Sequence, residues 1–593
     1  MKINSQTARI GIIAGFLLMV GCFLYFRFVV PYHVCFKEQI QLFVFSSSYF
    51  WSYFSKPAFL ARLGGDFLTQ FLYFKTGGAL LVTFLLLTEW WLIFLTLKRF
   101  FSVETRRAAS PRTWYAASLL PVMFEWVSFS NHSFSLSLSI SIIIALSIFL
   151  IYTKTTGKIS IVVGFLLIPV LYMIVGASVF LFLILVILYD IHCGRKQFIY
   201  WAVIFVFAVA IPVIFRYYFL LNLKQAFLYP YLEIKQGLSM VSLGALVLLF
   251  VCFKKIKLKT RMTSTKLNST RISFVQNLTS VLTMIVLFSI LIVGLVKTTD
   301  RKQESIFGMS IEAYHENWDK VLEIMEKNEL KSPIATSYAN LALSKKNLLG
   351  ERLMDFYQPF SSGLLLPNAP NVNWFAVFSA SDAYYHIGDM EMAQHAAMVG
   401  MISTPQQRSV RLVERLAKIN MATGDVPVAT KYMRMLGSTL FHKIDSESGI
   451  TNSAQNSLQQ YFAKDIIRRA TDIKLSLELL AESNPDNLPA VNYLLCFYLL
   501  NKDIPAFYKA YTSYCKDKIN PVPKVYSEAL LIYFAATKST MKQVTEYGIS
   551  PEVIKLFSDY TRLYENSEAD LASMQEKYPN TYWLFFHFAN IKK

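Results

Sequence analysis

The sequence predicts an all-α protein in which a polytopic transmembrane helix bundle of about nine spans precedes a helical-repeat domain. Three observations carry this prediction. Long apolar runs fill the first half of the chain, Lys and Arg cluster between alternate runs, and amphipathic helical periodicity with a recurring segment follows. We expect a transmembrane domain over residues 1–296, with one long outer loop at residues 32–77, and an extracytoplasmic helical-repeat domain over residues 303–593.

The distribution of charge argues against nucleic acid as a partner. The chain has 593 residues, 54% apolar and 16% charged, and a formal net charge of +19. Residues 1–296 hold 26 Lys or Arg and 7 Asp or Glu, whereas the remainder holds 32 of each. The positive excess therefore belongs to the apolar half, where basic loops set membrane topology. The predicted partner of this half is the lipid bilayer.

Nine apolar runs have the length of membrane-spanning helices. A helix needs about 20 apolar residues, with a range of about 17–25, to cross the hydrocarbon core. The first run, from Ile10 to Val30, exceeds the apolar core of a cleavable signal peptide and is interpreted as a retained span. The predicted spans lie near residues 10–30, 78–97, 113–129, 134–152, 159–175, 177–192, 198–215, 238–253 and 275–296.

The basic clusters orient these spans. Cytoplasmic loops collect Lys and Arg, and every second loop here is basic, whereas the turns near Asn131 and Gly176 carry neither residue type. We expect a multi-pass inner-membrane protein with a cytoplasmic N-terminus and a periplasmic domain beyond Lys297. Residues 159–192 are long for one crossing and short for two, so both remain open. Two crossings keep the later basic clusters cytoplasmic.

Residues 32–77 are rich in aromatic side chains and carry a few charges, a composition typical of amphipathic helices in the membrane interface. A connection of this length is usually functional or disordered, and the aromatic content argues against disorder. Its charged residues Glu38, Lys56, Arg62 and Asp66 are therefore the first candidates for a site. The alternative is structural, with Glu38 on a solvated face and Asp66 as a helix N-cap.

Three acids fall within or at the ends of predicted spans, namely Glu89, Glu125 and Asp190. An ionisable group in lipid is costly and points to function by default. Glu125 lies about one turn from the outer surface, and with the nearby His132 it is a candidate for substrate binding. The structural alternatives are a hydrogen bond between Glu89 and a neighbouring helix, and an interfacial Asp190 beside Arg195.

An internal repeat occurs in the second half. Residues 384–393 recur 36 residues later as 420–429 and, more loosely, as 497–506. A glycine, or Asn501 in the third copy, is expected at the turn between two helices. The pattern resembles the tetratricopeptide repeat, a 34-residue helix–turn–helix. This resemblance implies a TPR-like α-solenoid whose concave surface binds a protein partner. The alternative is a solenoid that only packs on the membrane half.

Motifs of the common hydrolases, metalloenzymes and nucleotide-binding enzymes are missing from the sequence. It contains no GxSxG, no HExxH, no P-loop and no GxGxxG opening a helix. Its six cysteines show no CxxC spacing, and its eight histidines are scattered. We therefore predict no metal site, and the sequence identifies no cofactor.

The membrane half is similar in layout to polytopic lipid-linked glycosyltransferases of the GT-C class. In that class a long first outer loop forms amphipathic helices and carries a catalytic acid soon after the first span. Here Glu38, preceded by a lysine instead of a second acid, stands at that place, and Lys56 opens a Lys-Pro step like the one found later in the class. The resemblance implies that Glu38 is a base for an acceptor hydroxyl, with Asp66 as a second acid. Lys56 and Arg62 would hold the lipid phosphate.

The whole chain also resembles a family of Bacteroidetes-type membrane proteins with a nine-to-ten-span front half and a repeat-bearing tail. Two functions are expected from these resemblances. The first is a GT-C-like glycosyltransferase that uses a polyprenyl-phosphate-linked donor for cell-envelope modification. The second is a non-enzymatic envelope scaffold that recruits protein partners through its TPR-like domain. A transporter is less favoured, because no regular series of intramembrane charges or Gly/Pro-broken helices occurs.

Overall fold

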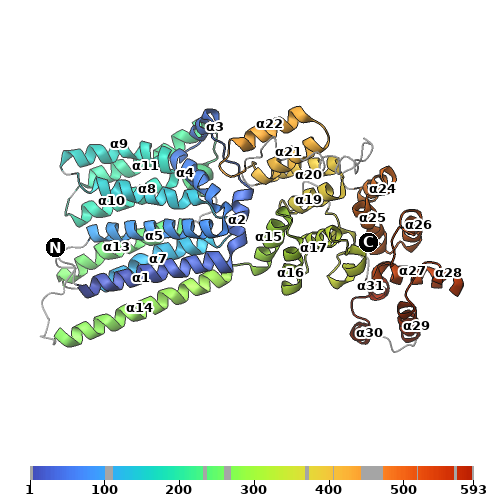
Figure 1. The fold of residues 1–593 in the computed structure, drawn as a ribbon. Coiled ribbons are helices and arrows are strands. Elements are labelled where there is room, and N and C mark those ends of the chain that lie inside the picture. Colours follow the sequence, from blue (N-terminus) through green and yellow to red (C-terminus); the bar gives the residue numbers. More distant parts are fainter. Residues whose placement is uncertain are drawn as a thin grey trace. The chain divides into compact units, whose positions relative to one another are not determined.

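The computed structural model confirms an all-α fold for the residues it describes, and it divides into two compact units (Figure 1). The first unit is Met1–Arg301 and the second is Lys302–Lys593. Each unit buries apolar side chains of its own. The structure describes residues 5–100, 111–131, 133–155, 157–195, 197–231, 237–259, 269–366, 373–404, 407–442, 472–516, 518–565 and 570–589.

The first unit contains a helix at each of the nine predicted spans, and Figure 1 shows these helices running along a common direction. Helical structure satisfies the backbone hydrogen bonds of an apolar run within the run itself, which explains why each long run forms a helix. Their bounds are Ser5–Leu24 (α1), Lys75–Arg99 (α5), Pro111–Phe129 (α7), Leu136–Tyr152 (α8), Lys158–Val175 (α9), Val179–His192 (α10), Phe198–Tyr218 (α11), Leu238–Lys259 (α13) and Ser269–Thr298 (α14).

Connections between these helices alternate between two ends of the bundle. At the first end, His33 Nε2, just after α1, lies 3.0 Å from the carbonyl oxygen of Phe129 at the end of α7. The backbone N–H of Ala177 there donates to the Tyr229 carbonyl at 2.8 Å. We call this the loop end, because it carries residues 32–77.

At the opposite end, which we call the basic end, the ring of Phe100 after α5 packs edge-on against Tyr189 near the end of α10, with centroids 6.0 Å apart. The Tyr189 hydroxyl donates to the Thr153 carbonyl, after α8, at 3.5 Å. The connections after α5, α8 and α10 therefore meet at this end. Successive helices of this part of the bundle thus run in opposite directions.

Helices α9 and α10 are the two legs of a hairpin. Arg195, just after α10, donates from Nη1 to Ser160 Oγ near the start of α9, at 3.5 Å. The turn between the legs contains Gly176, whose φ of +64° is left-handed and whose absent Cβ would lie 2.2 Å from the Tyr229 carbonyl oxygen. Only glycine fits both requirements. Residues 159–192 therefore form two helices, of 18 and 14 residues, that return to the end where they began.

Three described helical stretches are long and apolar enough to cross a membrane, or up to five if each of two bent helix pairs counts as one span. One of the three contains both legs of the α9–α10 hairpin, and several other bundle helices are shorter apolar segments. Nine crossings therefore stay a prediction. The three stretches are Lys75–Arg99, Ile159–His192 and Phe198–Tyr218.

The loop at residues 32–77 folds mainly into short helices, and the last of these, α4, packs closely on the bundle. Pro31–Gln39 forms α2, Ser47–Ser52 forms α3 and Phe59–Thr69 forms α4. In α4, Gly65 faces α8 so tightly that a Cβ would lie 2.4–2.7 Å from Ser137 atoms. This contact fixes the helix that carries the candidate residues Arg62 and Asp66. The N-cap alternative for Asp66 is wrong, because Asp66 lies inside α4, whose N-cap residue is Ala58.

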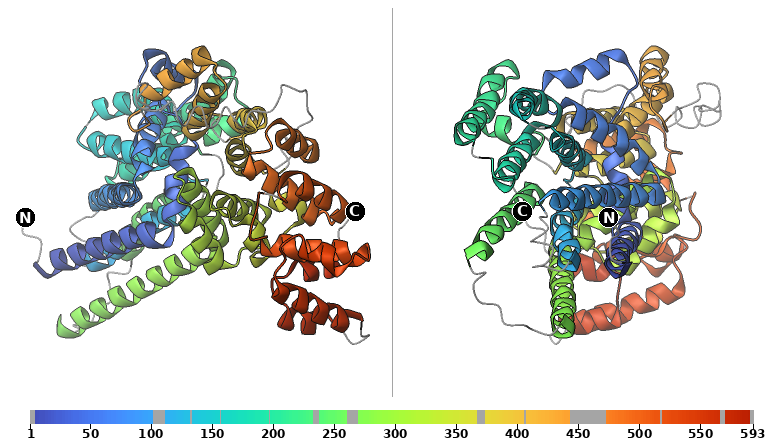
Figure 2. Two further views of the ribbon diagram at one scale, coloured as in Figure 1. Left: turned by 45° about the vertical axis from the view of Figure 1, so that its right-hand side comes forward. Right: turned by 90° about the vertical axis from the view of Figure 1, so that its left-hand side faces the viewer.

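The second unit is built from helices that pack against their neighbours in the sequence (Figure 2). Pairs such as α19 with α20 and α21 with α22 form extensive contacts. Its longer helices are Arg301–Tyr314 (α15), Trp318–Asn328 (α16), Pro333–Lys345 (α17), Ala376–Ile387 (α19), Met390–Ser403 (α20), Val410–Ala422 (α21), Val426–Gly437 (α22), Ile473–Ser483 (α24), Leu488–Leu500 (α25), Ile504–Tyr514 (α26), Lys524–Ala536 (α27), Pro551–Glu565 (α29), Leu571–Lys577 (α30) and Tyr582–Phe588 (α31).

The predicted repeat corresponds to helix hairpins with a shared capping aspartate. Asp389, Asp425 and Asp503 each accept a hydrogen bond from the backbone N–H three residues later, at 3.1, 3.3 and 3.1 Å. The residue before each aspartate is left-handed, a glycine in the first two hairpins and Lys502 in the third. The predicted register of the third copy, with Asn501 at the turn position, is therefore wrong by one residue. The capping aspartate, not the amino acid at the turn, defines the register.

Candidate functional site

A carboxylate and two tyrosines lie together in the loop at residues 32–77. Asp66 is half-buried on α4 and accepts a hydrogen bond from the Tyr53 hydroxyl at 2.7 Å. The Tyr49 hydroxyl lies 2.9 Å from that of Tyr53 and donates to the Leu42 carbonyl at 3.0 Å. Burial, and then the charge of Asp66, raise the pKa of Tyr53. The phenol thus keeps its proton and Asp66 is the acceptor.

Arg62 brings a positive charge to the same place. It lies one helical turn before Asp66 on α4, and its guanidinium carbon is 5.0 Å from the ring centroid of Tyr53 and 5.4 Å from that of Tyr229. Burial raises the pKa of Tyr229, while Arg62 lowers it and Asp66 raises it. Arg62 and Asp66 therefore act on shared aromatic neighbours, and cation–π contacts hold the guanidinium there. Tyr229, which follows the short helix Leu223–Leu228 (α12), was not predicted from the sequence.

Glu38 lies on α2 with only 4% of its surface exposed. Its carbonyl accepts a hydrogen bond from the backbone N–H of Gln41 at 3.0 Å, and the Gln41 side chain donates to the Asp66 carbonyl at 2.9 Å. Lys37 interacts electrostatically with Asp66, and its Nζ lies 5.6 Å from the ring centroid of Phe134. The end of α2 thus supports Asp66. Lys37 supplies a second positive charge that acts on Asp66.

The remaining predicted site residues do not join the cluster. Lys56 is exposed on the turn after Tyr53, and no hydrogen bond or ion pair links it to Asp66 in the described part of the chain. Glu125 is buried inside the bundle and hydrogen-bonded to α8. His132 lies outside the described residues. We name the group that does assemble, Asp66 with Tyr53, Arg62 and Lys37, the loop cluster.

The loop cluster has the parts needed for proton transfer next to an anion. A half-exposed carboxylate held by a phenol is a general base when a hydroxyl group approaches it. Arg62 and Lys37 are donors suited to a phosphate oxygen, and the guanidinium offers a planar, bidentate set. Asp66 and Arg62 were predicted from the sequence, whereas Tyr53 lacked any signal beyond being aromatic.

Two acids of the bundle, Glu89 and Glu125, are fully buried, and each accepts a serine hydrogen bond from a neighbouring helix. Ser239 Oγ on α13 donates to Glu89 Oε1 at 3.0 Å, and Ser139 Oγ on α8 donates to Glu125 Oε1 at 2.6 Å. The charge of Glu125 acts on Glu89. The predicted hydrogen bond between Glu89 and a neighbouring helix is confirmed.

Asp190 has the structural role expected of it. Its Oδ1 accepts a hydrogen bond from Arg195 Nη1 at 2.9 Å. Trp201 Nε1 lies 3.4 Å from the other carboxylate oxygen. The carboxylate is thus neutralised locally at the basic end of the bundle.

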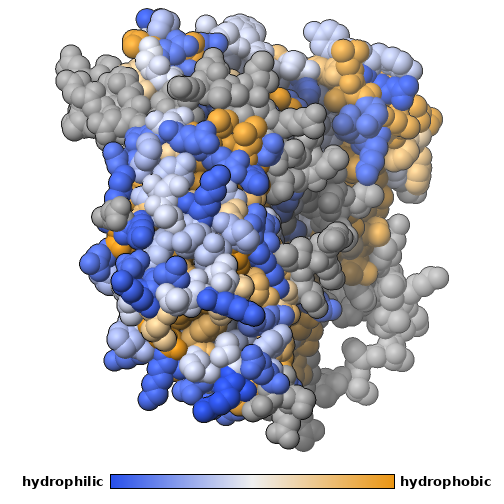
Figure 3. Space-filling view, turned by 90° about the vertical axis from the view of Figure 1, so that its right-hand side faces the viewer, coloured by the Kyte–Doolittle hydropathy of each residue, from blue (hydrophilic) through white to orange (hydrophobic). Residues whose placement is uncertain are grey.

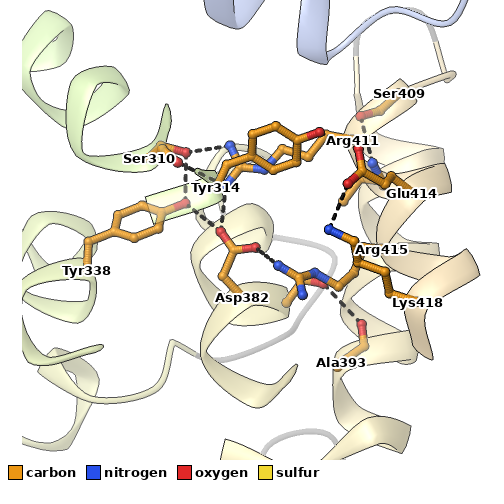
Figure 4. Close-up of polar contacts among 12 residues, drawn as sticks. Ser310, Tyr314, Tyr338, Asp382, Ala393, Ser409, Arg411, Glu414, Arg415 and Lys418 are labelled. Atoms are coloured by element: carbon orange, nitrogen blue, oxygen red, sulfur yellow. Dashed lines mark hydrogen bonds and ion pairs between the residues drawn. The ribbon is translucent and has the colours of Figure 1, made fainter. Parts of the chain in front are cut away.

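The second unit contains a buried ion cluster (Figure 4). Asp382 on α19 accepts hydrogen bonds from Arg411 at 2.5 Å and from Arg415 at 2.8 Å, both on α21. Arg411 also donates to the Ser310 hydroxyl of α15 at 2.9 Å, and the Tyr338 hydroxyl of α17 lies 3.4 Å from Asp382. Four helices are thereby fastened through one carboxylate. We interpret this group as structural, because its charges are satisfied internally.

Sequence reasoning missed this ion cluster. The available signal was one acid in the apolar face of α19, where Asp382 stands between Ala380 and Ala383, and two arginines one turn apart on α21. The pairing itself joins residues 29 and 33 positions apart. Such a pairing follows from how the helices pack and not from local periodicity.

Metal binding and known relatives give no further assignment. Among the described residues, no group of three or more His, Cys, Asp or Glu side chains is placed to hold a metal ion. A model of a protein family of unknown function, DUF6057, matches residues 5–589. No curated protein and no solved structure matches the chain.

Proposed function

We propose that this chain, which belongs to the DUF6057 family of unknown function, is a multi-pass inner-membrane transferase. It moves a sugar or related group from a polyprenyl-phosphate carrier to an acceptor in the cell envelope. The observation that carries the proposal is the loop cluster, in which Asp66 and Arg62 lie one turn apart around Tyr53. An acid and a cation at that spacing suit an acceptor hydroxyl and a lipid phosphate.

The surface of the first unit supports a membrane location. Helix α11 exposes Val203, Phe205, Val206 and Ile214 at 50–66% of their surface. Apolar side chains gathered on one helix in this way need a covering, and lipid supplies it. Nine crossings, with the N-terminus in the cytoplasm and the second unit in the periplasm, also agree with the basic loops.

The transfer step uses residues of the loop cluster. Asp66 accepts the proton of the acceptor hydroxyl while the oxygen of that hydroxyl forms a bond to the anomeric carbon of the donor. The bond from that carbon to the phosphate oxygen breaks at the same time, and the electron pair leaves with polyprenyl phosphate. Arg62 and Lys37 hold the leaving phosphate, while the Gln41 side chain, just after α2, holds the backbone of Asp66. Exposed Trp51 and Phe54 form an apolar surface near the donor's lipid chain.

Substitution of Asp66 tests the transferase proposal. Purified protein in detergent is given polyprenyl-phosphate-linked hexoses with an acceptor extract, and released polyprenyl phosphate is measured. We expect Asp66→Asn to lose at least about 100-fold in rate while still binding the donor, as is typical for removal of a general base. Arg62→Ala should weaken donor binding. Asp570→Asn, at an exposed helix cap of the second unit, serves as the control. A wild-type rate for Asp66→Asn would refute the proposal.

A second function has one observation in its favour. The second helices of two hairpins expose Met398 and Ile402 on α20 and Val426 on α22, at 40–74% of their surface. A TPR-like solenoid that recruits a protein partner would use such side chains. If deletion of the gene changes the cell envelope, this scaffold function predicts that Asp66→Asn reverses the change fully while Ile402→Asp does not. The transferase predicts the reverse.

A further inference from the structure

A short segment with exposed apolar side chains joins α11 to α12 at the loop end of the bundle. We call residues 217–223 the α11–α12 turn. In it, Tyr217, Tyr218 and Leu223 expose 69%, 77% and 50% of their surface, and Leu220 exposes 92%. No large apolar side chain of the described residues is more exposed than that of Leu220. Neighbouring apolar side chains exposed to this extent indicate a surface that contacts another apolar medium.

The backbone of the turn places Leu220 where glycine is the usual residue. The Leu221 N–H donates to the Arg216 carbonyl at 2.9 Å, a hydrogen bond that closes the end of α11. Leu220, between them, has a left-handed φ of +52°. Glycine commonly takes this position, because a side chain strains a left-handed backbone. In water, glycine would avoid both the strained backbone and the exposed leucine. A leucine here is favoured if its side chain enters an apolar medium.

Helix α12 holds the second end of the turn against the bundle. The Tyr172 hydroxyl of α9 donates to the Ala226 carbonyl of α12 at 2.9 Å. The rings of Phe180 on α10 and Phe227 on α12 stack with their centroids 5.9 Å apart. The turn is therefore fixed at the loop end by contacts of α12 with both legs of the α9–α10 hairpin.

The exposed surface of α11 indicates that lipid covers the turn. Of the three stretches that are long and apolar enough to cross a membrane, α11 is the least buried. Its exposed apolar side chains extend from Ile199 through Val206 to Ile214, four residues before Tyr218. The α11–α12 turn continues this surface past the end of the helix, and tyrosine is typical of the membrane interface.

The charges around the turn are all positive. Arg216 precedes it and Lys224 follows it, and the sequence contains no Asp or Glu between Asp190 and Glu233. Arg216 Nη2 donates to the Tyr217 hydroxyl at 2.9 Å, which keeps this cation beside an exposed ring. Lys and Arg near a membrane surface are attracted to anionic headgroups. Cations beside exposed apolar side chains therefore fit the surface of an anionic bilayer.

We propose that the α11–α12 turn inserts into the membrane interface, with Leu220 among the acyl chains and Arg216 and Lys224 on the phosphates of anionic phospholipids. This inference rests on the membrane location in the proposed function and not on the transfer step. Helix α12 leads from the turn to Tyr229, whose ring lies 5.4 Å from the Arg62 guanidinium carbon. The inserted turn thus fixes the depth of the loop cluster relative to the lipid headgroups.

Fluorescence quenching in vesicles tests the inserted turn. Full-length Leu220→Cys, with the native cysteines replaced, carries a bimane probe. The vesicles contain phosphatidylglycerol or phosphatidylcholine with a spin label near the headgroup end of an acyl chain. We expect both lipids to quench the probe, phosphatidylglycerol at least about twofold more strongly because two cations attract it. Iodide on both sides of the membrane should quench little. Arg216→Gln/Lys224→Gln should remove the difference between the two lipids.

Two control positions distinguish failure of this inference from failure of the membrane location. Val206→Cys, in the middle of α11, should be quenched by a spin label deeper in the acyl chain. Ser133→Cys, exposed between α7 and α8, should be quenched by iodide. Absence of lipid quenching at Val206→Cys would refute the membrane location itself.

Three results with Val206→Cys quenched by lipid would overturn the inserted turn alone. Iodide quenching of Leu220→Cys would place the turn in water, and protection from both quenchers would mean that protein covers it. Equal quenching by the two lipids would contradict the role of Arg216 and Lys224. If Leu220→Cys does not fold, Leu223→Cys carries the probe with the same expected results.

Discussion

Asp382 accepts hydrogen bonds from two arginines whose side chains are almost fully removed from water, at 2% and 10% exposure. Removing the acid leaves two buried guanidinium groups without their counter-charge. We expect Asp382→Asn to lower the free energy of unfolding of the second unit by about 3–5 kcal/mol, the usual cost of breaking a buried pair. Chemical denaturation followed by circular dichroism measures it.

An exposed ion pair of the same unit provides the control for Asp382. Asp486 pairs with Lys518 at 2.6 Å, but its side chain is 84% exposed. Asp486→Asn should change the free energy of unfolding by less than about 1 kcal/mol. Equal effects of the two substitutions would show that the buried cluster does not stabilise the unit.

Glu528 makes the stability of the second unit depend on pH. Its carboxylate accepts the backbone N–H of Tyr582 at 2.6 Å, and burial raises its pKa to about 7. The folded state thus binds a proton more tightly than the unfolded state, where the pKa is about 4.5. The contribution of Glu528 to the free energy of unfolding is therefore greatest below about pH 4.5. It falls by up to about 3 kcal/mol in total as pH rises from about 4.5 through about 7.

Glu528→Gln should remove this pH dependence. Gln cannot ionise and keeps an oxygen that accepts the Tyr582 N–H, so the free energy of unfolding should no longer fall between about pH 5 and pH 8. Urea denaturation at these two pH values measures the difference. Glu552→Gln, at an exposed position of α29, should follow wild type. A wild-type slope in Glu528→Gln would assign the pH dependence to other groups.

Adjacent glycines in α4 provide a test of element packing. A Cβ at Gly65 would lie 2.5 Å from the backbone nitrogen of Ser137 on α8, whereas one at Gly64 would make ordinary contact with the Ile140 side chain, at 3.5 Å and beyond. Gly65→Ala should destabilise the first unit by about 1–3 kcal/mol because α4 must move away from α8. Gly64→Ala should be neutral or stabilising by up to about 1 kcal/mol, since alanine favours helix.

Thermal unfolding of the two variants in detergent measures the difference. If both alanines have the same effect, α4 does not pack on α8 as closely as the structure has it. A lower midpoint for Gly65→Ala alone supports the contact that positions Arg62 and Asp66.

Helices were predictable from the sequence, whereas the contacts between their side chains were not. Apolar run length is a local property, and each of the nine runs proved helical. By contrast, the Glu89–Ser239 hydrogen bond joins residues 150 positions apart, and even Tyr53 and Asp66 are separated by a turn and a helix start. The sequence therefore favoured Glu38 over Asp66, although it is Asp66 that accepts the phenol hydrogen bond and shares aromatic neighbours with Arg62.

At the scale of the whole molecule, the chain consists of two units with separate cores. The face of the second unit seen in Figure 3 is mostly hydrophilic, with small apolar patches, as expected for a unit that faces water. We expect residues 302–593, expressed alone, to form a soluble helical monomer with cooperative thermal unfolding. Insolubility, or unfolding without a transition, would show that this unit depends on the first.

Topology of the whole chain can be read from three cysteine positions. Nine crossings place Ser133 and Ser539 on the periplasmic side and Cys193 on the cytoplasmic side. Ser133 and Cys193 are exposed, and Ser539 is partly exposed. A single crossing at residues 159–192 would place Cys193 on the periplasmic side and Ser539 on the cytoplasmic side. Ser133 would stay on the periplasmic side. The hairpin favours the first arrangement, because Ser160 and Arg195 meet at the same end of the bundle.

A membrane-impermeant maleimide applied to intact spheroplasts separates the two arrangements. Each tested protein has a single cysteine, with the other native cysteines replaced. We expect the maleimide to label Ser133→Cys and Ser539→Cys in intact spheroplasts. A protein that keeps only Cys193 should be labelled only after the membrane is permeabilised. Labelling of Cys193 from outside together with protection of Ser539→Cys would mean one crossing at residues 159–192. The second unit would then be cytoplasmic, and the basic loops after α10 would face away from the cytoplasm. Protection of Ser133→Cys would reverse the bundle as a whole and place the loop cluster on the cytoplasmic side, where a periplasmic acceptor cannot reach Asp66.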